Sequence, residues 1–457
     1  MKHIRIVSIL LLCVAGAQVQ AGVTFTTLAS FNGQQNGAYP AGELLQARDG
    51  NFYGTTIQGG DSDYGTVFKV NPDWTVSSLF SFNSNNGAYP RSGLAQSLSG
   101  ELSFYATTTE GGANGLGTVF KILADGNFTP LFSFNGTNGA NPQSGLTWSS
   151  SGSLLGVTYS GGTNNWPPAY GTVFEVTTGG ELTSLVSFDG PNGLGPYGAL
   201  VQGPDGNYYG TTQFGGSESL GTVFRITPAG VFTSLASFHG TNGARPCSRL
   251  AVGNDGNLYG TAYTGGLSNL GTIFRMSTSG DLTTVFSFAG TNGSNPFDGL
   301  TFVEAEGAFY GTTSSGGGPT GEGVGTVFRL TPDGTLTTLV AFEGSNGAFP
   351  VAGLTRGTDG NLYSTTQKGG ANGMGTLFRL AITSAPAPVL HAEQADNRIA
   401  LSWDSVADQA YQVQYKTDLA EATWHDLGAP VTATATTTTV YDNIGPDAQR
   451  FYRVWVK

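Results

Sequence analysis

The fold is decided by a short stretch in the middle of the chain: DGNLYGT at residues 255–261, a double glycine at 265–266 and GTIFRM at 271–276. The Asp-Gly pair is typical of a tight hairpin turn, and the runs that follow it are rich in residues that favour strands. A short strand is expected around Leu250, and a last strand from Leu282 to Phe288. Four strands of about six residues with short turns account for a repeat near 50 residues. The stretch therefore predicts one four-stranded antiparallel sheet.

This pattern recurs along the chain. The tetrapeptide Gly-Thr-Val-Phe, or a close variant, begins at Gly65, Gly117, Gly171, Gly221, Gly271, Gly325 and Gly375. A second marker, Asn-Gly-x-x-Pro, begins at Asn36, Asn86, Asn138, Asn192, Asn242, Asn292 and Asn346. Both markers recur every 50 to 54 residues in fixed phase. The chain therefore contains seven repeats, numbered one to seven below, and a period of this length is typical of propellers and solenoids.

The two ends of the array differ from its middle. The pattern of the last strand appears from Phe25 to Phe31, before repeat one, whereas no such strand follows Gly375 to Leu380 in repeat seven. A closed ring explains both facts if residues 24–31 complete the sheet of repeat seven, whereas an open solenoid would leave two exposed sheet edges. The sequence therefore predicts an all-β protein with a seven-bladed β-propeller over residues 22–383, closed by its N-terminal strand.

The composition agrees with this fold class. Of 457 residues, 71 are Gly and 20 are Pro, which suits many tight turns, and the 28 Phe, 18 Tyr and 6 Trp exclude a disordered low-complexity chain. The net charge is −12, and no cluster of Lys and Arg forms the basic surface that phosphate groups require. We therefore expect no nucleic-acid partner.

Residues 1–21 resemble an export signal. Two basic residues are followed by an apolar stretch at 6–17, too short to span a bilayer, and by small residues at 19–21 before a cut. No later apolar run is long enough to span a membrane, and removal of the signal leaves Cys247 as the single cysteine, so no internal disulfide is expected. We expect a secreted monomer, outside the cell or at its surface, with the periplasm as the alternative.

The C-terminal part is expected to be a separate domain. Residues 384–388 form a short, stiff Ser/Ala/Pro linker. Residues 389–457 contain β-rich runs separated by turn residues, at 398–403, 410–415, 424–427, 436–441 and 451–456. The tryptophan of the first run and the alternating Tyr-x-Val-x-Tyr of the second resemble a fibronectin type III module. This resemblance implies a small β-sandwich.

The order of motifs within each repeat resembles two known repeat families. The order P-x-x-G-L, DGNLY, GG, GTVFR and TL is similar to the kelch blade, whose double glycine ends the second strand. More specifically, the pattern is similar to the GloVer tandem repeat of secreted bacterial proteins, over about residues 24–380. Repeats two, three and six depart from it, because other residues replace Asp-Gly-Asn at 99–101, 151–153 and 306–308. The resemblance implies export and a propeller, and no established activity.

Few side chains offer catalytic or metal chemistry. The four histidines are scattered along the chain, so we expect no zinc or copper site and no cofactor. Asp61 and Asp63 share one loop but lack the other ligands of a calcium motif, which favours a solvated loop. Cys247 lies eight residues after His239, but a small packed side chain beside Pro246 is the better interpretation.

Residues that differ from repeat to repeat are the candidates for a ligand site. The residue before the proline of Asn-Gly-x-x-Pro varies and gives four candidates: Tyr39, Tyr89, Arg245 and Phe349. Trp166 lies in the double-glycine loop of repeat three, and loops of these two kinds are expected on one face. Exposed rings amid Asn, Ser and Thr suit sugar stacking or protein contact, and packing of the loops themselves is the alternative.

Three charged residues stand where most repeats carry small residues, at the start of the innermost strand: Glu43, Arg249 and Asp298. They are expected to place charge near the mouth of the propeller channel. A glycosidase needs two carboxylates on opposite sides of the scissile bond, and Glu43 and Asp298 are the candidates. A salt bridge to Arg249, or plain solvation, is the alternative that we favour.

Three classes of function compete. Variable loops on a repeat scaffold favour an exported, non-catalytic binding or adhesion protein that takes a glycan or a protein ligand on one propeller face. A carbohydrate-active enzyme with its site at the channel mouth is the first alternative, which two convergent carboxylates would favour. A purely structural surface or matrix protein is the second, which a featureless face would favour.

Overall fold

The computed structural model describes residues 22–163, 170–383, 390–395, 398–405, 410–418, 421, 423–443 and 450–456. The expected signal, the linker at 384–388 and Trp166 lie outside the described residues. The chain divides into two compact parts, Phe25–Ala381 and a second part that contains Ile382–Lys457 together with Met1–Thr24. Among the described residues, no helix is long and apolar enough to cross a membrane.

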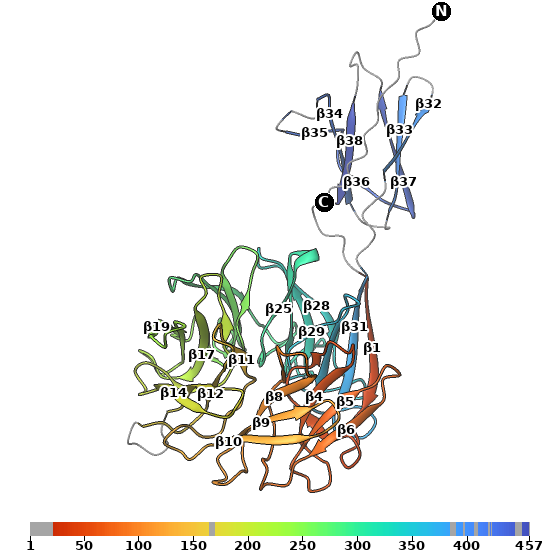
Figure 1. Ribbon diagram of the computed structural model, residues 1–457. Coiled ribbons are helices and arrows are strands. Elements are labelled where there is room, and N and C mark those ends of the chain that lie inside the picture. The colour runs from red at the N-terminus through yellow and green to blue at the C-terminus, as the bar shows by residue number, and fades with distance from the viewer. Residues whose placement is uncertain are drawn as a thin grey trace, which may run out of the picture. The chain divides into compact units, whose positions relative to one another are not determined.

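The part Phe25–Ala381 is built from antiparallel sheets of four or five strands, one for each repeat (Figure 1). In the described residues helix is nearly absent, and the 3-10 turn η1 (Glu304–Glu306) lies in repeat six, where Asp-Gly-Asn is replaced. The all-β class expected from the composition is therefore confirmed.

Within the sheets of repeats one to six the strands follow one another in chain order. Repeats one and two contribute β2 (Ala38–Pro40), β3 (Leu45–Gln46), β4 (Phe52–Gln58), β5 (Thr66–Val70), β6 (Val76–Ser81), β7 (Ala95–Gln96), β8 (Ser103–Thr108), β9 (Thr118–Leu123) and β10 (Phe128–Ser133). Repeats three and four contribute β11 (Thr147–Trp148), β12 (Leu154–Thr158), β13 (Thr172–Val176), β14 (Leu182–Ser187), β15 (Leu194–Pro196), β16 (Val201–Gln202), β17 (Tyr208–Phe214), β18 (Thr222–Ile226) and β19 (Phe232–Ser237). Repeats five to seven contribute β20 (Ala244–Pro246), β21 (Ala251–Val252), β22 (Leu258–Thr264), β23 (Thr272–Met276), β24 (Leu282–Ser287), β25 (Thr301–Val303), β26 (Ala308–Thr313), β27 (Thr326–Leu330), β28 (Leu336–Ala341), β29 (Thr355–Arg356), β30 (Leu362–Thr366) and β31 (Thr376–Thr383).

Repeat five shows how the sequence builds a sheet. The Asp-Gly turn joins β21 to β22, and Tyr259 on β22 lies opposite Arg275 on β23. The innermost strands, β20 and β21, are two or three residues long and thus shorter than expected. The reason is Pro246 at the end of β20, which has no N–H to continue the ladder. The chain leaves the sheet there, and the segment after the proline becomes free to line the interior.

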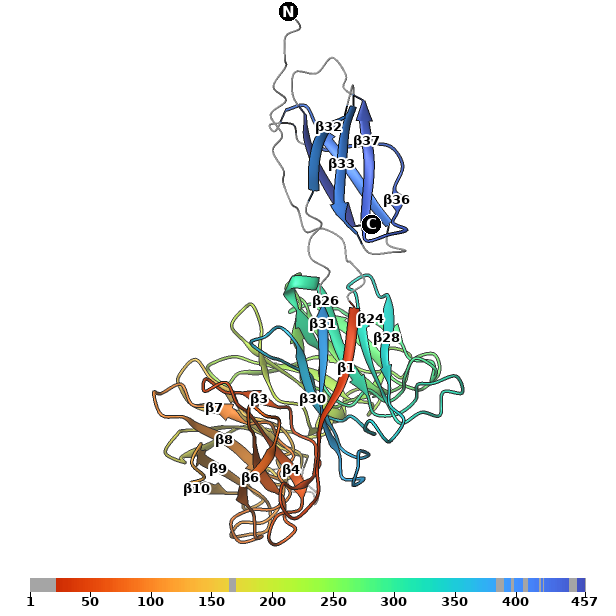
Figure 2. The same cartoon turned by 90° about the vertical axis from the view of Figure 1, so that its right-hand side faces the viewer.

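The N-terminal strand belongs to the sheet of the last repeat. β1 (Gly22–Ser30) is its outer strand, in the order β1-β31-β30-β29, and Figures 1 and 2 both draw β1 (red) beside β31 (blue). The N–H of Phe31 donates to the carbonyl oxygen of Gly375 at 3.0 Å, as that of Phe82 does to Gly65 within repeat one. The ring of Phe25 also packs on that of Phe378, with 5.3 Å between centroids.

Neighbouring sheets meet through a glycine and a proline. A Cβ on Gly65, the first residue of Gly-Thr-Val-Phe in repeat one, would lie 2.7 Å from Cδ of Pro90 in repeat two. The same contact joins repeat seven to repeat one, because a Cβ on Gly375 would lie 2.7 Å from Cδ of Pro40. Only glycine allows so close an approach, which explains why this residue recurs in every repeat.

A backbone hydrogen bond accompanies each of these contacts. The residue before the proline donates its N–H to the residue before the glycine, as Tyr89 does to Tyr64 and Tyr39 does to Met374, both at 2.9 Å. This position has a φ between +53° and +63° in all seven repeats, at Tyr39, Tyr89, Asn141, Gly195, Arg245, Asn295 and Phe349. The contact between neighbouring sheets uses only the backbone of the residue before the proline, so the side chain of this residue is free to vary.

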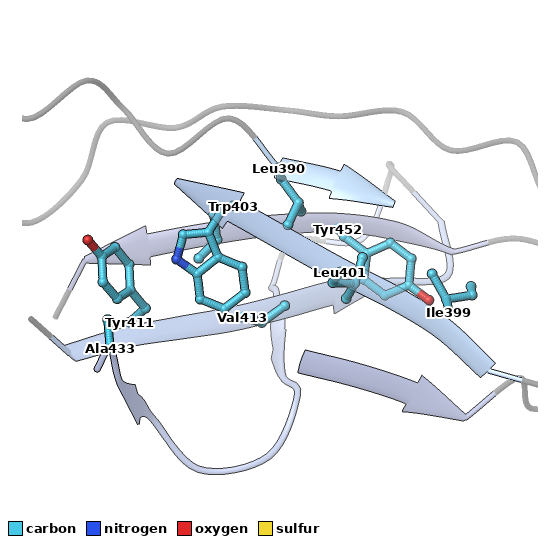
Figure 3. Close-up of a cluster of buried hydrophobic side chains, with 9 residues drawn as sticks. Leu390, Ile399, Leu401, Trp403, Tyr411, Val413, Ala433 and Tyr452 are labelled. Carbon is cyan, nitrogen blue, oxygen red and sulfur yellow. The ribbon is translucent and has the colours of Figure 1, made fainter. Parts of the chain in front are cut away.

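The C-terminal part contains two sheets. One has the order β32-β33-β37, with β32 (Leu390–Ala395), β33 (Arg398–Asp404) and β37 (Thr437–Asn443). In the other, β34 (Ala410–Lys416) pairs with β35 (His425–Asp426), β36 (Val431–Thr432) and β38 (Phe451–Val456). Side chains of both sheets share one buried cluster, in which Trp403 packs on Tyr411 (Figure 3). The relation to fibronectin type III modules stays a prediction.

Candidate functional site

One cavity, of about 530 Å³, receives residues from all seven repeats. The residue directly after the proline of Asn-Gly-x-x-Pro lines it in every repeat, and these residues are Ala41, Arg91, Gln143, Tyr197, Cys247, Phe297 and Val351. The seven side chains all differ, although the surrounding strands are nearly identical in sequence. The cavity is thus one of the places where the repeats differ from one another.

The three charged residues expected at the channel mouth all line this cavity. Nη2 of Arg249 lies 3.0 Å from Oε1 of Glu43, so repeats five and one are joined by an ion pair. The two oxygens of Asp298 accept the N–H groups of Gly299 and Gly353, each at 2.6 Å. A Cβ on Gly353 would lie 3.6 Å from Cγ of Asp298 and 3.7 Å from Cδ of Glu43, so the two carboxyl groups are neighbours.

Both carboxyl groups hold their protons more tightly than usual. Loss of solvent raises the pKa of Glu43, the Arg249 guanidinium opposes the rise, and Asp298 adds to it. Loss of solvent also raises the pKa of Asp298, against the hydrogen bond from Gly299 and the charge of Arg249. The pKa of Arg249 is raised in turn, chiefly by Glu43. The cluster is electrostatically coupled, with Arg249 as its cation.

Aromatic rings form another wall of the cavity. The ring of Tyr197 meets that of Phe297 edge to face, with 5.4 Å between centroids. These residues come from repeats four and six, and the small Cys247 of repeat five lies between them in the sequence order. Its Sγ donates to the carbonyl oxygen of Phe297 at 3.2 Å. Burial raises the pKa of the Cys247 thiol, so the thiol is protonated and a poor nucleophile.

Cys247 and His239, the pair that the sequence analysis considered and did not favour, do not share a site. Nδ1 of His239 lies 3.0 Å from the hydroxyl of Thr241, and His239 lines a different hollow, of about 540 Å³, together with Arg245 and Asn269. Cys247 is 3% exposed, which agrees with its interpretation as a packed side chain.

The residues before the prolines do not line the shared cavity. Three of their side chains contact the double-glycine region of the same or of a neighbouring repeat. Tyr89 packs on the ring of Tyr64 with 5.7 Å between centroids, Arg245 lies 5.3 Å from the centre of the Phe214 ring, and the Lys368 ammonium lies 5.0 Å from that of Phe349. Tyr39 is half-buried in β2, and Trp166 lies outside the described residues.

The sequence favours the variable residue before each proline as a candidate ligand residue, whereas the variable residue after each proline lines the cavity. Both residues that flank the proline differ between repeats, so variability does not distinguish them. The deciding fact is the positive φ before the proline, which turns that side chain away from the interior. A tyrosine or phenylalanine in this conformation carries no signal of it in the sequence.

No metal centre is found among the residues that the structure describes, since no three His, Cys, Asp or Glu side chains gather in one place there. Oδ1 of Asp63 accepts the N–H of Gly59 at 2.8 Å, so this carboxylate closes its own loop.

Several solved structures are similar to this chain at low identity. The BP39L lectin of Burkholderia pseudomallei is 11% identical, with a TM-score of 0.51 over 77% of this chain and 97% of that chain. A gluconolactonase of Xanthomonas campestris is 17% identical, with a TM-score of 0.37 over 63% of this chain and 92% of that chain. A Trichoderma reesei carbohydrate-active enzyme of family AA12 is 13% identical, with a TM-score of 0.39 over 81% and 100%. The likeness to the lectin concerns the fold alone.

No curated protein matches the chain. The Gloeobacter/Verrucomicrobia repeat matches it three times, over residues 17–165, 102–254 and 248–400. These matches cover most of the chain and both sequence markers of the array. The chain belongs to the Gloeobacter/Verrucomicrobia repeat family.

Proposed function

We propose that this chain is an exported, non-catalytic binding protein. It forms a closed seven-bladed propeller and binds a glycan or protein ligand in the cavity lined by the residues that follow the seven prolines. One observation carries the proposal: the residue after the proline of each repeat lines a shared cavity, and this position holds a different residue in every repeat. A concave site lined by rings and a few polar groups is typical of ligand binding. A purely structural array would have no reason to place seven different side chains around one cavity.

The closure of the ring rests on contacts between the ends of the array. The glycine–proline contact that joins repeats one and two is found again between repeats seven and one. The hydroxyl of Thr355 donates to the carbonyl oxygen of Leu44 at 2.6 Å, and the N–H of Thr358 donates to Oε1 of Gln46 at 2.7 Å. Neighbouring repeats elsewhere in the array bond in the same way, as Thr147 does to Leu200.

The state of the charged cluster supports binding rather than catalysis. A glycosidase needs one carboxyl group free to protonate the leaving oxygen and another free to attack or to activate water. Glu43 is paired with Arg249, and both oxygens of Asp298 accept backbone N–H groups. These contacts fix the cluster as part of the wall.

The proposal is tested by glycan-array binding and by affinity capture from the native surroundings, with the full exported chain. A Gln143→Ala/Phe297→Ala variant should lose at least tenfold in affinity for whatever the wild type binds, because both side chains line the cavity. The matched control is Tyr39→Ala, which removes a variable ring outside the cavity. Equal affinity of the wild type and the cavity variant, or loss of binding in the Tyr39→Ala control alone, would contradict the proposal.

A second candidate, a carbohydrate-active enzyme, is favoured by one observation. Glu43 and Asp298 are neighbours beside the cavity, and both have a raised pKa, as a general acid requires. Incubation with polysaccharides, followed by measurement of new reducing ends, tests it. Activity that disappears in both Glu43→Gln and Asp298→Asn would replace binding by catalysis as the function.

Export is proposed from the first 21 residues, with a cut after Ala21. N-terminal sequencing of the protein recovered outside the cytoplasm should begin at Gly22. An intact Met1 in that material would contradict the assignment.

A further inference from the structure

The charged and polar groups of the cavity fall into two sectors. In repeats five, six and one, the groups satisfy one another: Arg249 pairs with Glu43, and backbone N–H groups bind Asp298. The charges of this sector are therefore already engaged with one another or with the backbone. The other sector comprises repeats two, three and four.

The second sector holds three polar ends without partners. The side chains of Arg91, Gln143 and Tyr197 line the cavity from consecutive repeats, each half-buried. Among the described residues, no carboxylate lies within ion-pair distance of Arg91, and no hydrogen bond engages the side chains of these three. The three side chains thus present a guanidinium, an amide and a phenol to the same space.

Arg91 lies close enough to Tyr197 for its charge to act on the phenol. Burial raises the pKa of Tyr197, and the positive charge of Arg91 opposes that rise more than any other group. Gln143 comes from the repeat between them, so the guanidinium and the phenol flank its amide. An unpaired guanidinium presents a rigid fork of donors that matches a carboxylate with two parallel hydrogen bonds.

We propose that the cavity selects a sugar that carries a carboxylate, a hexuronate, with Arg91 as the partner of the carboxylate and with Gln143 and Tyr197 donating to the sugar. This inference rests on the proposed function and names its ligand class. The cavity volume of about 530 Å³ suits one or two sugar rings, and the edge-to-face pair Tyr197–Phe297 supplies an apolar wall. Arg249 is paired with Glu43, and two backbone N–H groups hold the Asp298 carboxylate, which leaves Arg91 as the cation without an ion-pair partner among the described residues of the cavity.

The experiment compares sugars that differ only at the carboxylate. Ligand-observed NMR titration of the full exported chain gives the affinity for glucuronate, galacturonate and mannuronate and for glucose, galactose and mannose. At least one uronate should bind tenfold or more tightly than its neutral partner, and its affinity should fall with rising ionic strength, since salt screens the attraction. Arg91→Gln should remove this preference, and Arg91→Lys should keep part of it. Arg245→Gln is the control, an arginine outside the cavity whose loss should change nothing.

The outcomes separate the inference from the proposed function. Equal affinity for acidic and neutral partners, or an unchanged preference in Arg91→Gln, overturns the inference and leaves the proposed function standing. Failure of all three uronates to bind also overturns it, and the glycan array and the capture experiment then decide the proposed function by themselves. Because Arg91→Gln changes a half-buried side chain, its melting temperature is measured beside the wild type. If Arg91→Gln is misfolded, the preference in Arg91→Lys and the salt dependence of the wild type decide.

Discussion

Pro40 lies against Gly375, although the two residues stand near opposite ends of the repeat array. A Cβ on Gly375 would lie 2.7 Å from Cδ of Pro40 and 2.4 Å from the carbonyl oxygen of Thr366. The second of these atoms belongs to the backbone and has no room to move. The seam between the last repeat and the first is therefore packed as tightly as the seams inside the array.

Gly375→Ala should lower the free energy of unfolding by about 2–3 kcal/mol, because the new methyl group meets backbone and the residue has a φ of +106°. Gly373→Ala is the matched control, since Gly373 also has a positive φ but a Cβ there meets nothing within 4 Å. The control should lose only about 1 kcal/mol, the cost of the backbone conformation. Denaturant unfolding measures both. Equal losses of stability in the two variants would mean that close packing at the contact between repeats seven and one contributes nothing to stability.

Phe349 stands before the proline of repeat seven with a φ of +53°. A β-branched side chain is strongly disfavoured in this conformation, whereas glycine fits, as Gly195 does at the same position of repeat four. Phe349→Val should therefore cost about 1–3 kcal/mol of stability, and Phe349→Gly should cost less than Phe349→Val. Thermal unfolding of the two variants checks the order. The reverse order would show that the ring, rather than the backbone, sets the stability here.

The sequence predicted the strands well where the signal is local. In repeat five the expected strand at residues 271–276 is β23 (Thr272–Met276), and the expected strand from Leu282 to Phe288 is β24 (Leu282–Ser287). Turn glycines, the regular period and β-branched runs all act within one repeat. The short strand expected around Leu250 is β21 (Ala251–Val252). The strand β20 (Ala244–Pro246) escaped prediction because it ends in a proline, which also fits a turn.

The site depends on features that no local pattern contains. Arg249 and Glu43 are 206 residues apart, and they meet because the array brings the first and the fifth repeat to one cavity. The sequence marked both as exceptions to the repeat rule, which was enough to select them. The sequence did not mark Arg91, Gln143 or Tyr197 in the same way. Both residues that flank each proline vary between repeats, and the backbone conformation alone decides which of the two faces the cavity.

The turn carboxylate of repeat seven gives a pH dependence with a definite sign. Burial alone would raise the pKa of Asp359, but hydrogen bonds from Tyr363 and Asn361 outweigh it and hold this pKa below its usual value. A lowered native pKa means that the contribution to stability is present above the unfolded pKa of about 4 and is lost as the pH falls through the native value. The stability difference between the wild type and Asp359→Asn should therefore shrink between pH 6 and pH 3.

Tyr363, which donates a hydrogen bond to Asp359, predicts a loss of stability at alkaline pH. Burial and the Asp359 carboxylate raise the pKa of Tyr363 to about 12. Its contribution is present below the unfolded pKa of about 10 and is lost as the pH rises through 12. Tyr363→Phe should remove this alkaline loss and also reduce the acid limb of Asp359. If the pH dependence of stability in Tyr363→Phe equals that of the wild type at both acid and alkaline pH, the 2.7 Å hydrogen bond between Tyr363 and Asp359 contributes nothing to stability.

Substitution of Arg249 tests how much its ion pair with Glu43 contributes to stability. Arg249→Met leaves the Glu43 carboxylate without its cation, so its already raised pKa rises further. The loss of stability should reach about 1–2 kcal/mol at pH 8, below the cost of a fully buried pair because the Arg249 side chain is 40% exposed. A raised native pKa means that the penalty grows as the pH rises through that value and vanishes where Glu43 is protonated. The loss at pH 4 should accordingly be smaller than at pH 8, and Arg249→Met/Glu43→Gln should recover most of it at both values. Denaturant unfolding at the two pH values gives the four comparisons, and a loss that is independent of pH would assign Arg249 a packing role instead of an electrostatic one.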